Sequence, residues 1–177
     1  MADDGDELLR HVLGEIQRRG GIGPVAIAEA IAHSDSFVAA CPDDLTAAAD
    51  LGSGGGLPGL VLAVRLPGLA FHLIERRATR ADLLRFGVAA LGLGGRVEVH
   101  GEDVASFAAR GVPIDLVTAR SFASSIITLR AAAAVLGPAG WVFVSDPPTP
   151  FPVRPADLTA LSLSEVDAVG GIRRYRR

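Results

Sequence analysis

Residues 50–59 of this 177-residue chain read Asp50-Leu51-Gly52-Ser53-Gly54-Gly55-Gly56-Leu57-Pro58-Gly59, and this stretch decides the fold. An apolar run from Leu45 to Leu51 leads into the glycines, and an apolar stretch with helical spacing follows Pro58. Glycine accepts positive φ and lets a ligand approach the backbone, and proline suits the first turn of a helix. The stretch therefore predicts a strand, a tight turn and a helix whose N-terminal N–H groups face a nucleotide-like ligand.

Two classes of cofactor fit this turn. Residues 54–59 satisfy the Gly-x-Gly-x-x-Gly fingerprint of dinucleotide binding, and Glu75 follows where a ribose-binding acid is expected. The competing pattern is the Asp-x-Gly-x-Gly-x-Gly loop of class I S-adenosylmethionine methyltransferases, filled here by Asp50, Gly52, Gly54 and Gly56. An acid at the strand end repels a pyrophosphate but attracts a ligand that carries an ammonium and a sulfonium. Asp50 therefore favours S-adenosylmethionine over a dinucleotide, and a surface loop without a ligand is the third interpretation.

The composition is that of a globular protein, with 49% hydrophobic and 21% charged residues. No apolar stretch approaches the roughly 18 residues that span a bilayer, and the acidic residues 3–7 are the reverse of a signal peptide. The single cysteine, Cys41, excludes an intramolecular disulfide and a cysteine-rich zinc site. We expect a cytoplasmic protein without a membrane partner.

The charges are unevenly distributed. All 17 basic residues are arginine, and the net charge of −3 argues mildly against a protein that binds nucleic acid through many phosphate contacts. One arginine cluster follows Glu75, in residues 76–85, and another ends the chain, in residues 173–177. A solvated helix face and a frayed tail are the plain interpretations of these two clusters.

The order of elements predicts an α/β protein: a Rossmann-like, mostly parallel, doubly wound sheet with N-terminal helices. Helices are expected over residues 7–19, 24–40, 77–91 and 122–136, and strands over 45–51, 69–75, 96–100, 114–118 and 141–145. We predict one domain, residues 1–177. It comprises an N-terminal helical region (1–44), a cofactor-binding core (45–146), and a proline-rich loop with a basic tail (147–177).

Residues 50–60 resemble the signature of the bacterial small-subunit rRNA guanine-N7 methyltransferases, the glucose-inhibited division protein B family. The Leu-Pro-Gly after the glycine loop distinguishes that family from other methyltransferases. Further similarities are Glu75 followed by Arg80, Leu83 and Leu84, then Thr118-Ala119-Arg120 before a helix, and more faintly residues 33–37. The resemblance covers roughly residues 33–145. It implies a class I methyltransferase that uses S-adenosylmethionine, yields S-adenosylhomocysteine, and acts on small-subunit rRNA or the ribosomal subunit.

The sequence also departs from the family. The N-terminal region is shorter, Thr79 stands where a lysine is usual, and Ser145-Asp146-Pro147-Pro148 replaces a Lys-Gly pair after the fifth strand. An acid in place of a lysine near the target leaves two alternatives open. One is a methyltransferase of a small molecule or another macromolecule, and the other is a catalytically silent S-adenosylmethionine-binding protein.

The pattern and the resemblance together assign candidate site residues. The cofactor-binding set is Asp50, Gly52, Ser53, Gly54, Gly56, Leu57, Pro58, Glu75, Arg76, Glu102, Asp103, Val104 and Arg120. Asp50 is expected to face the methionine moiety, Glu75 to accept both ribose hydroxyls, and either Glu102 or Asp103 to accept from the adenine amino group. A turn acceptor and a helix-start acid are the structural alternatives for Asp50 and Glu75.

Arg120 is the candidate catalytic residue, and Arg80 and Arg120 are the candidate substrate-binding residues. Arg120 follows a buried strand into the crevice, where its guanidinium can donate to a base carbonyl or a phosphate; a salt bridge to Glu102, Asp103 or Asp50 is the alternative. Guanine N7 is a neutral lone pair, so a direct displacement needs no general base. The four histidines show no ligand spacing, and we expect no metal. The sequence does not reveal the oligomeric state.

Overall fold

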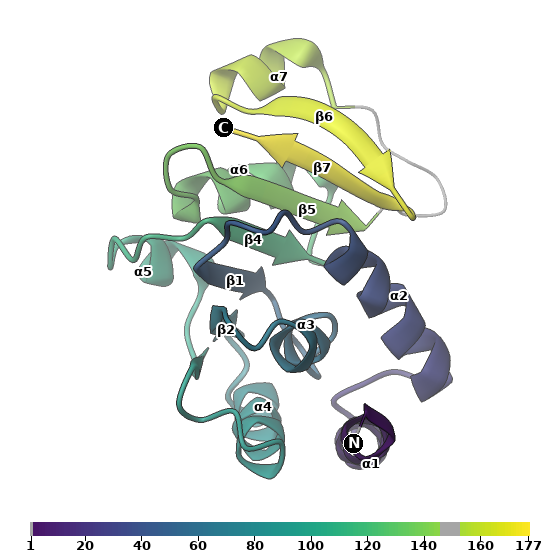
Figure 1. The fold of residues 1–177 in the computed structure, drawn as a ribbon. Helices are drawn as coiled ribbons and strands as arrows, with labels where there is room; N and C mark the ends of the chain where they lie inside the picture. The colour runs from purple at the N-terminus through teal and green to yellow at the C-terminus, as the bar shows by residue number, and fades with distance from the viewer. Residues whose placement is uncertain (1, 146–152) are drawn as a thin grey trace.

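Within residues 2–145 and 153–177, which the computed structural model describes, strands form one sheet in the order β3-β2-β1-β4-β5-β7-β6 (Figure 1). The strands are β1 (Ala47–Leu51), β2 (Ala70–Ile74), β3 (Val97–His100), β4 (Leu116–Ala119), β5 (Trp141–Ser145), β6 (Ser164–Val169) and β7 (Ile172–Arg176). The helices are α1 (Ala2–Arg18), α2 (Ile27–Ala39), α3 (Gly59–Arg65), α4 (Ala78–Ala90), α5 (Val104–Ala108), α6 (Ser125–Val135) and α7 (Pro155–Ala160).

The first five strands are parallel, and this confirms the predicted α/β fold class. β1 pairs with β2 on one side and with β4 on the other, and only β7 runs antiparallel to its neighbours β5 and β6. A parallel strand is covered on both faces, so its residues read as an apolar run. Ala48, Ala49 and Leu51 of the central strand are accordingly fully buried.

Helices cover both faces of the sheet. On one face, apolar side chains of α1, α2, α3 and α4 pack in one core with Phe71, Leu73 and Phe143. On the other face, α5 and α6 pack with Ile74, Val117 and Val142 in a second core. The carboxyl ends of β1, β2, β3 and β4 therefore meet at one edge between the two layers, where ligands of such sheets bind.

The C-terminal segment corrects the sequence prediction. Instead of the basic tail expected within residues 147–177, residues 153–177 form α7 and the hairpin of β6 and β7. Gly170 and Gly171 both have positive φ, which suits a two-residue hairpin turn. The C-terminal arginines pair across the hairpin, with Arg174 Nε donating to Asp167 Oδ1 at 2.6 Å, rather than fraying into solvent. Of the segment Ser145-Asp146-Pro147-Pro148, only Ser145 is among the described residues, so the departure from the family at residues 146–148 lies outside them.

Two shorter differences lie near the sheet edge. The helix expected from Phe122 begins only at Ser125, because Ser121 adopts a left-handed φ of 52° and turns the chain. Helix α5 was not predicted; Asp103 caps it by accepting from the N–H of Ser106 at 2.8 Å. In the part of the chain that the structure describes, no helix has the length and apolar character needed to cross a bilayer.

Candidate functional site

Two adjoining cavities lie over the carboxyl ends of the parallel strands and share Gly52, Arg80 and Ser121. The first, here the glycine-loop cavity, has a volume of about 380 Å³ and is lined by residues 21–25, 52–55, 57, 80, 120 and 121. The second, here the Glu75 cavity, has a volume of about 470 Å³ and is lined by residues 52, 74–77, 80, 102–104, 121–123 and 127. Together they form one crevice across the glycine loop.

The glycine loop takes the backbone conformation that its sequence predicts. Gly52, Gly54 and Gly56 have φ of 63°, 55° and 96°, a region that side chains disfavour. A Cβ added to Gly54 would lie 3.7 Å from Gly52 O and 3.9 Å from Arg80 Nη1, which are ordinary van der Waals contacts, so at this residue the positive φ and not crowding favours glycine. A Cβ on Gly56 would lie 2.4 Å from Leu60 Cδ1, so this glycine serves the packing of the loop on α3.

Asp50 supports the loop from beneath. Its side chain is 1% exposed and lines neither cavity. Thr118 Oγ1 on β4 donates to Asp50 Oδ1 at 2.8 Å, while Oδ2 has no hydrogen-bond partner among the described residues. Burial raises the pKa of Asp50 to about 6, and the hydroxyl of Thr118 partly opposes the rise. The structure thus places the acid that was expected to face the methionine moiety under the loop.

The raised pKa of Asp50 leads to a prediction about stability. The folded state binds this proton more tightly than the unfolded state, whose pKa is near 3.8, so stability falls as pH rises from about 4 to about 6. Asp50→Asn lacks this titration. From pH 4 to pH 7, the unfolding free energy of the wild type relative to the variant is expected to fall by roughly 2.4 kcal/mol.

Urea unfolding at a series of pH values measures this difference, with Asp44→Asn as the control at an exposed carboxylate. A difference that stays constant or rises with pH would show that Asp50 is not buried as described.

Glu75 connects the glycine loop to the start of α4. Its side chain is 5% exposed, and it follows β2 directly into the crevice. Gly54 N–H donates to Oε2 at 3.1 Å, and Arg77 N–H donates to Oε1 at 2.8 Å. Each carboxylate oxygen retains a further lone pair, so Glu75 is fixed in place and still able to accept from a ligand.

The segment after β3 supplies three further residues of the Glu75 cavity. Glu102 Oε1 lies 2.9 Å from Arg110 Nε, whereas Asp103 is exposed and caps α5. The N–H of Ser106 lowers the pKa of Asp103. Val104 lines the same cavity, as does Arg76 from the segment after Glu75. The choice between Glu102 and Asp103 as the adenine acceptor stays a prediction.

Arg80 and Arg120 are the charged residues that line the glycine-loop cavity. Neither forms an ion pair or a side-chain hydrogen bond with the described part of the chain, so the salt bridge that was the alternative for Arg120 is not formed. Arg120 is half-buried, and burial lowers its pKa while the charge of Asp50 opposes the shift. A guanidinium that lines a cavity without a hydrogen-bonded partner favours an anionic or carbonyl-bearing ligand.

The crevice brings most of the predicted site residues together. Asp50, Gly56 and Pro58 are the predicted residues that line neither cavity. Sequence reasoning missed the loop of residues 21–25, which lines the glycine-loop cavity, and residues 121–123 with Ile127, which line the Glu75 cavity. The sequence signal for the first loop was Gly20-Gly21-Ile22-Gly23-Pro24, which was interpreted only as a separator between two helices. In the structure this loop packs closely on the glycine loop, because a Cβ on Gly55 would lie 2.6 Å from Gly21 O.

The structure brings together two histidines whose spacing along the chain gave no sign of a shared site. His72 and His100, far apart in sequence, bring ring nitrogens within 3.0 Å of each other, and Glu98 lies beside both. Strand pairing, rather than spacing along one element, creates this group.

Comparison with known proteins identifies the family. Residues 27–145 match the family GidB, described as rRNA small subunit methyltransferase G. The chain belongs to this family. The resemblance noted on residues 50–60 is therefore confirmed. The matched range includes the lining of the Glu75 cavity and that of the glycine-loop cavity except residues 21–25.

Individual relatives of this GidB-family chain carry the same description. It is 45% identical over 74 residues to ribosomal RNA small subunit methyltransferase G of Rhizorhabdus wittichii, covering 42% of this chain and 33% of that protein. The protein of the same name from Acidiphilium cryptum is 44% identical over 100 residues, covering 56% and 44%. The matched segments thus cover less than half the length of each of these two relatives.

Solved structures support the fold. An O-methyltransferase family protein from Burkholderia thailandensis superimposes with a TM-score of 0.62 at 17% identity, over 84% of this chain and 54% of that one. The mitomycin 7-O-methyltransferase MmcR gives a TM-score of 0.61 at 19% identity, over 83% and 53%. At this level of identity the likeness extends to the class I methyltransferase fold and no further.

Proposed function

We propose that this chain is an S-adenosylmethionine-dependent methyltransferase that methylates N7 of a guanine in small-subunit rRNA. The observation that carries the proposal is the crevice itself, which joins a glycine loop and a fixed carboxylate to a cavity with two unpaired arginines. The family description and the names of its relatives support both the reaction and the substrate.

The residues of the crevice fit the cofactor. Gly54 lines the glycine-loop cavity without a side chain, and its N–H holds the Glu75 carboxylate at the cavity wall. Glu75 would accept the ribose hydroxyls, while Val104, Phe122 and Ile127 offer apolar surface beside Glu102 and Asp103 for the adenine. When bound, S-adenosylmethionine supplies a methyl group activated on a sulfonium.

The glycine-loop cavity suits a neutral nucleophile. Among the described residues that line it there is no carboxylate, histidine or cysteine, and its charged groups are Arg80 and Arg120. Guanine N7 attacks as a lone pair without first losing a proton, so the protein needs only to align the base and exclude water. Arg120 would donate to a base carbonyl or a phosphate, and Ile22 and Leu57 provide apolar walls.

The decisive test of this function uses small ribosomal subunits from a strain that lacks the modification. The purified chain with S-adenosylmethionine is expected to produce 7-methylguanosine in the rRNA, detected by mass spectrometry of its nucleosides. Cofactor binding without methylation of the subunit would instead support another substrate or a catalytically silent protein. The absence of both would remove the methyltransferase assignment.

Removing the guanidinium of Arg120 gives a sharper prediction. Arg120→Ala is expected to lower kcat/KM for subunit methylation about tenfold, because one charge-assisted hydrogen bond is worth roughly 1.5 kcal/mol. Affinity for S-adenosylhomocysteine should change little if Arg120 serves the acceptor.

Arg154→Ala, at an exposed arginine of the α7 N-terminus, is the matched control. Equal rates for wild type and Arg120→Ala would contradict the acceptor role, as would a loss of cofactor affinity alone.

A further inference from the structure

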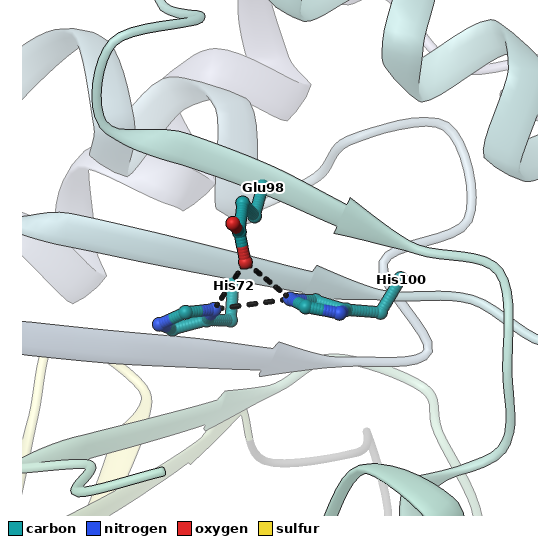
Figure 2. A group of neighbouring side chains, drawn as sticks. All are labelled: His72, Glu98 and His100. Carbon is teal, nitrogen blue, oxygen red and sulfur yellow. Dashed lines mark hydrogen bonds and ion pairs between the residues drawn. The ribbon is translucent and has the colours of Figure 1, made fainter. Parts of the chain in front are cut away.

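A second group of polar side chains lies on the sheet away from the crevice. His72 on β2 faces Glu98 and His100 on the edge strand β3 (Figure 2). His72 pairs with Glu98 in register, and His100 is two residues further along, so all three project from the same face of the sheet. None of the three lines the glycine-loop cavity or the Glu75 cavity.

The donor atoms of this group converge. His72 Nδ1 lies 3.0 Å from His100 Nε2, and Glu98 Oε2 lies 3.6 Å from the first and 3.4 Å from the second. A tetrahedral zinc ion with bonds of about 2.0–2.1 Å holds its ligands roughly 3.3 Å apart. The three distances match that separation, and two imidazoles with one carboxylate form a donor set that zinc accepts.

The surroundings of the two rings hold them in place on the sheet. Both rings pack on Phe107 of α5, at centroid distances of 5.5 Å and 4.8 Å, which restricts their orientation. Burial lowers the pKa of His72 and of His100, which favours the neutral form of each ring. The Glu98 side chain is 72% exposed, so water can reach the fourth position of a metal.

His100 also has an outer partner. Its second nitrogen, Nδ1, lies 3.6 Å from Glu102 Oε1, longer than a hydrogen bond, and the same oxygen lies 2.9 Å from Arg110 Nε. A carboxylate behind a coordinating imidazole is the usual arrangement around protein-bound zinc, because it fixes the ring and increases its basicity.

We propose that His72, Glu98 and His100 form a binding site for a divalent transition-metal ion of the zinc class, with water as the fourth ligand. Without metal, one N–H lies between His72 Nδ1 and His100 Nε2, which are 3.0 Å apart. Metal binding needs the lone pair of both nitrogens, so each neutral ring would carry its proton on its other nitrogen, Nε2 of His72 and Nδ1 of His100, with no net release of protons. The ion would link the edge strand β3 to β2. Strand β3 ends at His100, two residues before the segment 102–104 that lines the Glu75 cavity.

Zinc competition with a chromophoric chelator and cobalt absorption test the proposal on the purified full chain. We expect one zinc ion per chain, a higher melting temperature with zinc, and the intense visible bands of tetrahedral cobalt. His72→Ala and Glu98→Ala should weaken zinc binding by at least about a hundredfold and abolish those bands, since loss of even an outer partner costs 10- to 100-fold.

His11→Ala, at an exposed histidine of α1, is the control and should bind as the wild type does. Glu98 is exposed, so Glu98→Ala decides the question even if His72→Ala fails to fold. The proposal would be overturned if the wild type and Glu98→Ala bound zinc with equal affinity, or if the wild type bound zinc no more tightly than His72→Ala. Neither outcome depends on methyltransferase activity.

Discussion

Glu75→Gln is expected to weaken binding of S-adenosylhomocysteine about ten- to hundredfold and to destabilise the protein as well. The amide replaces one acceptor oxygen with a donor, and both oxygens of Glu75 already accept backbone N–H groups, from Gly54 and Arg77. A buried N–H facing another donor costs roughly 1–3 kcal/mol of folding stability. The same substitution removes a charge-assisted acceptor from the ribose, which corresponds to roughly 1.5–3 kcal/mol of affinity.

Thermal melting with and without S-adenosylhomocysteine separates the two effects. The variant should melt below the wild type without ligand and show a smaller upward shift when ligand is added. Glu7→Gln changes an exposed carboxylate of α1 and should reproduce the wild type in both respects. An unchanged ligand-induced shift in Glu75→Gln would show that Glu75 only caps the start of α4.

Gly56→Ala is expected to destabilise the fold by roughly 2–6 kcal/mol in total. The φ of 96° at this residue is a conformation that alanine resists, at a cost of about 1–3 kcal/mol. Its Cβ would also lie 2.4 Å from Leu60 Cδ1, and Leu60 is fully buried, so relief requires repacking at a further cost of about 1–3 kcal/mol.

The melting temperature should accordingly fall by about 10 °C. Gly14→Ala is the matched control: a Cβ there meets nothing within 4 Å inside α1, and alanine should stabilise the helix by about 0.5–1 kcal/mol. A stable Gly56→Ala protein that loses only cofactor affinity would show that this glycine contacts the ligand instead.

The sequence predicted the parallel half of the sheet because each strand there is buried on both faces and followed by a helix. Those strands read as apolar runs ending at Asp50, Glu75 or Arg120, and the chemistry of these strand-end residues pointed to the crevice. β6 and β7 escaped prediction because β6 is exposed and β7 is rich in arginine, so their pairing depends on cross-strand ion pairs such as Arg174 with Asp167. No single segment carries that information.

Within the site, residue types were easier to predict than their orientations. Asp50 and Glu75 both end a strand, yet the Asp50 carboxylate lies beneath the loop with Thr118 whereas Glu75 faces a cavity. Asp50 lies within β1, where its register partner is Leu73, whereas Glu75 lies one residue beyond the end of β2. Where each strand ends relative to its neighbour follows from tertiary packing. The histidine pair escaped prediction for a related reason, since His72 and His100 meet only through the register of β2 with β3.

Titration calorimetry of the wild-type chain with S-adenosylhomocysteine tests the central claim most directly, namely that the crevice beside the glycine loop and Glu75 binds the methyl donor. The account predicts saturable binding of one ligand per chain. An absence of saturable binding up to millimolar ligand, in protein shown to be folded, would contradict it.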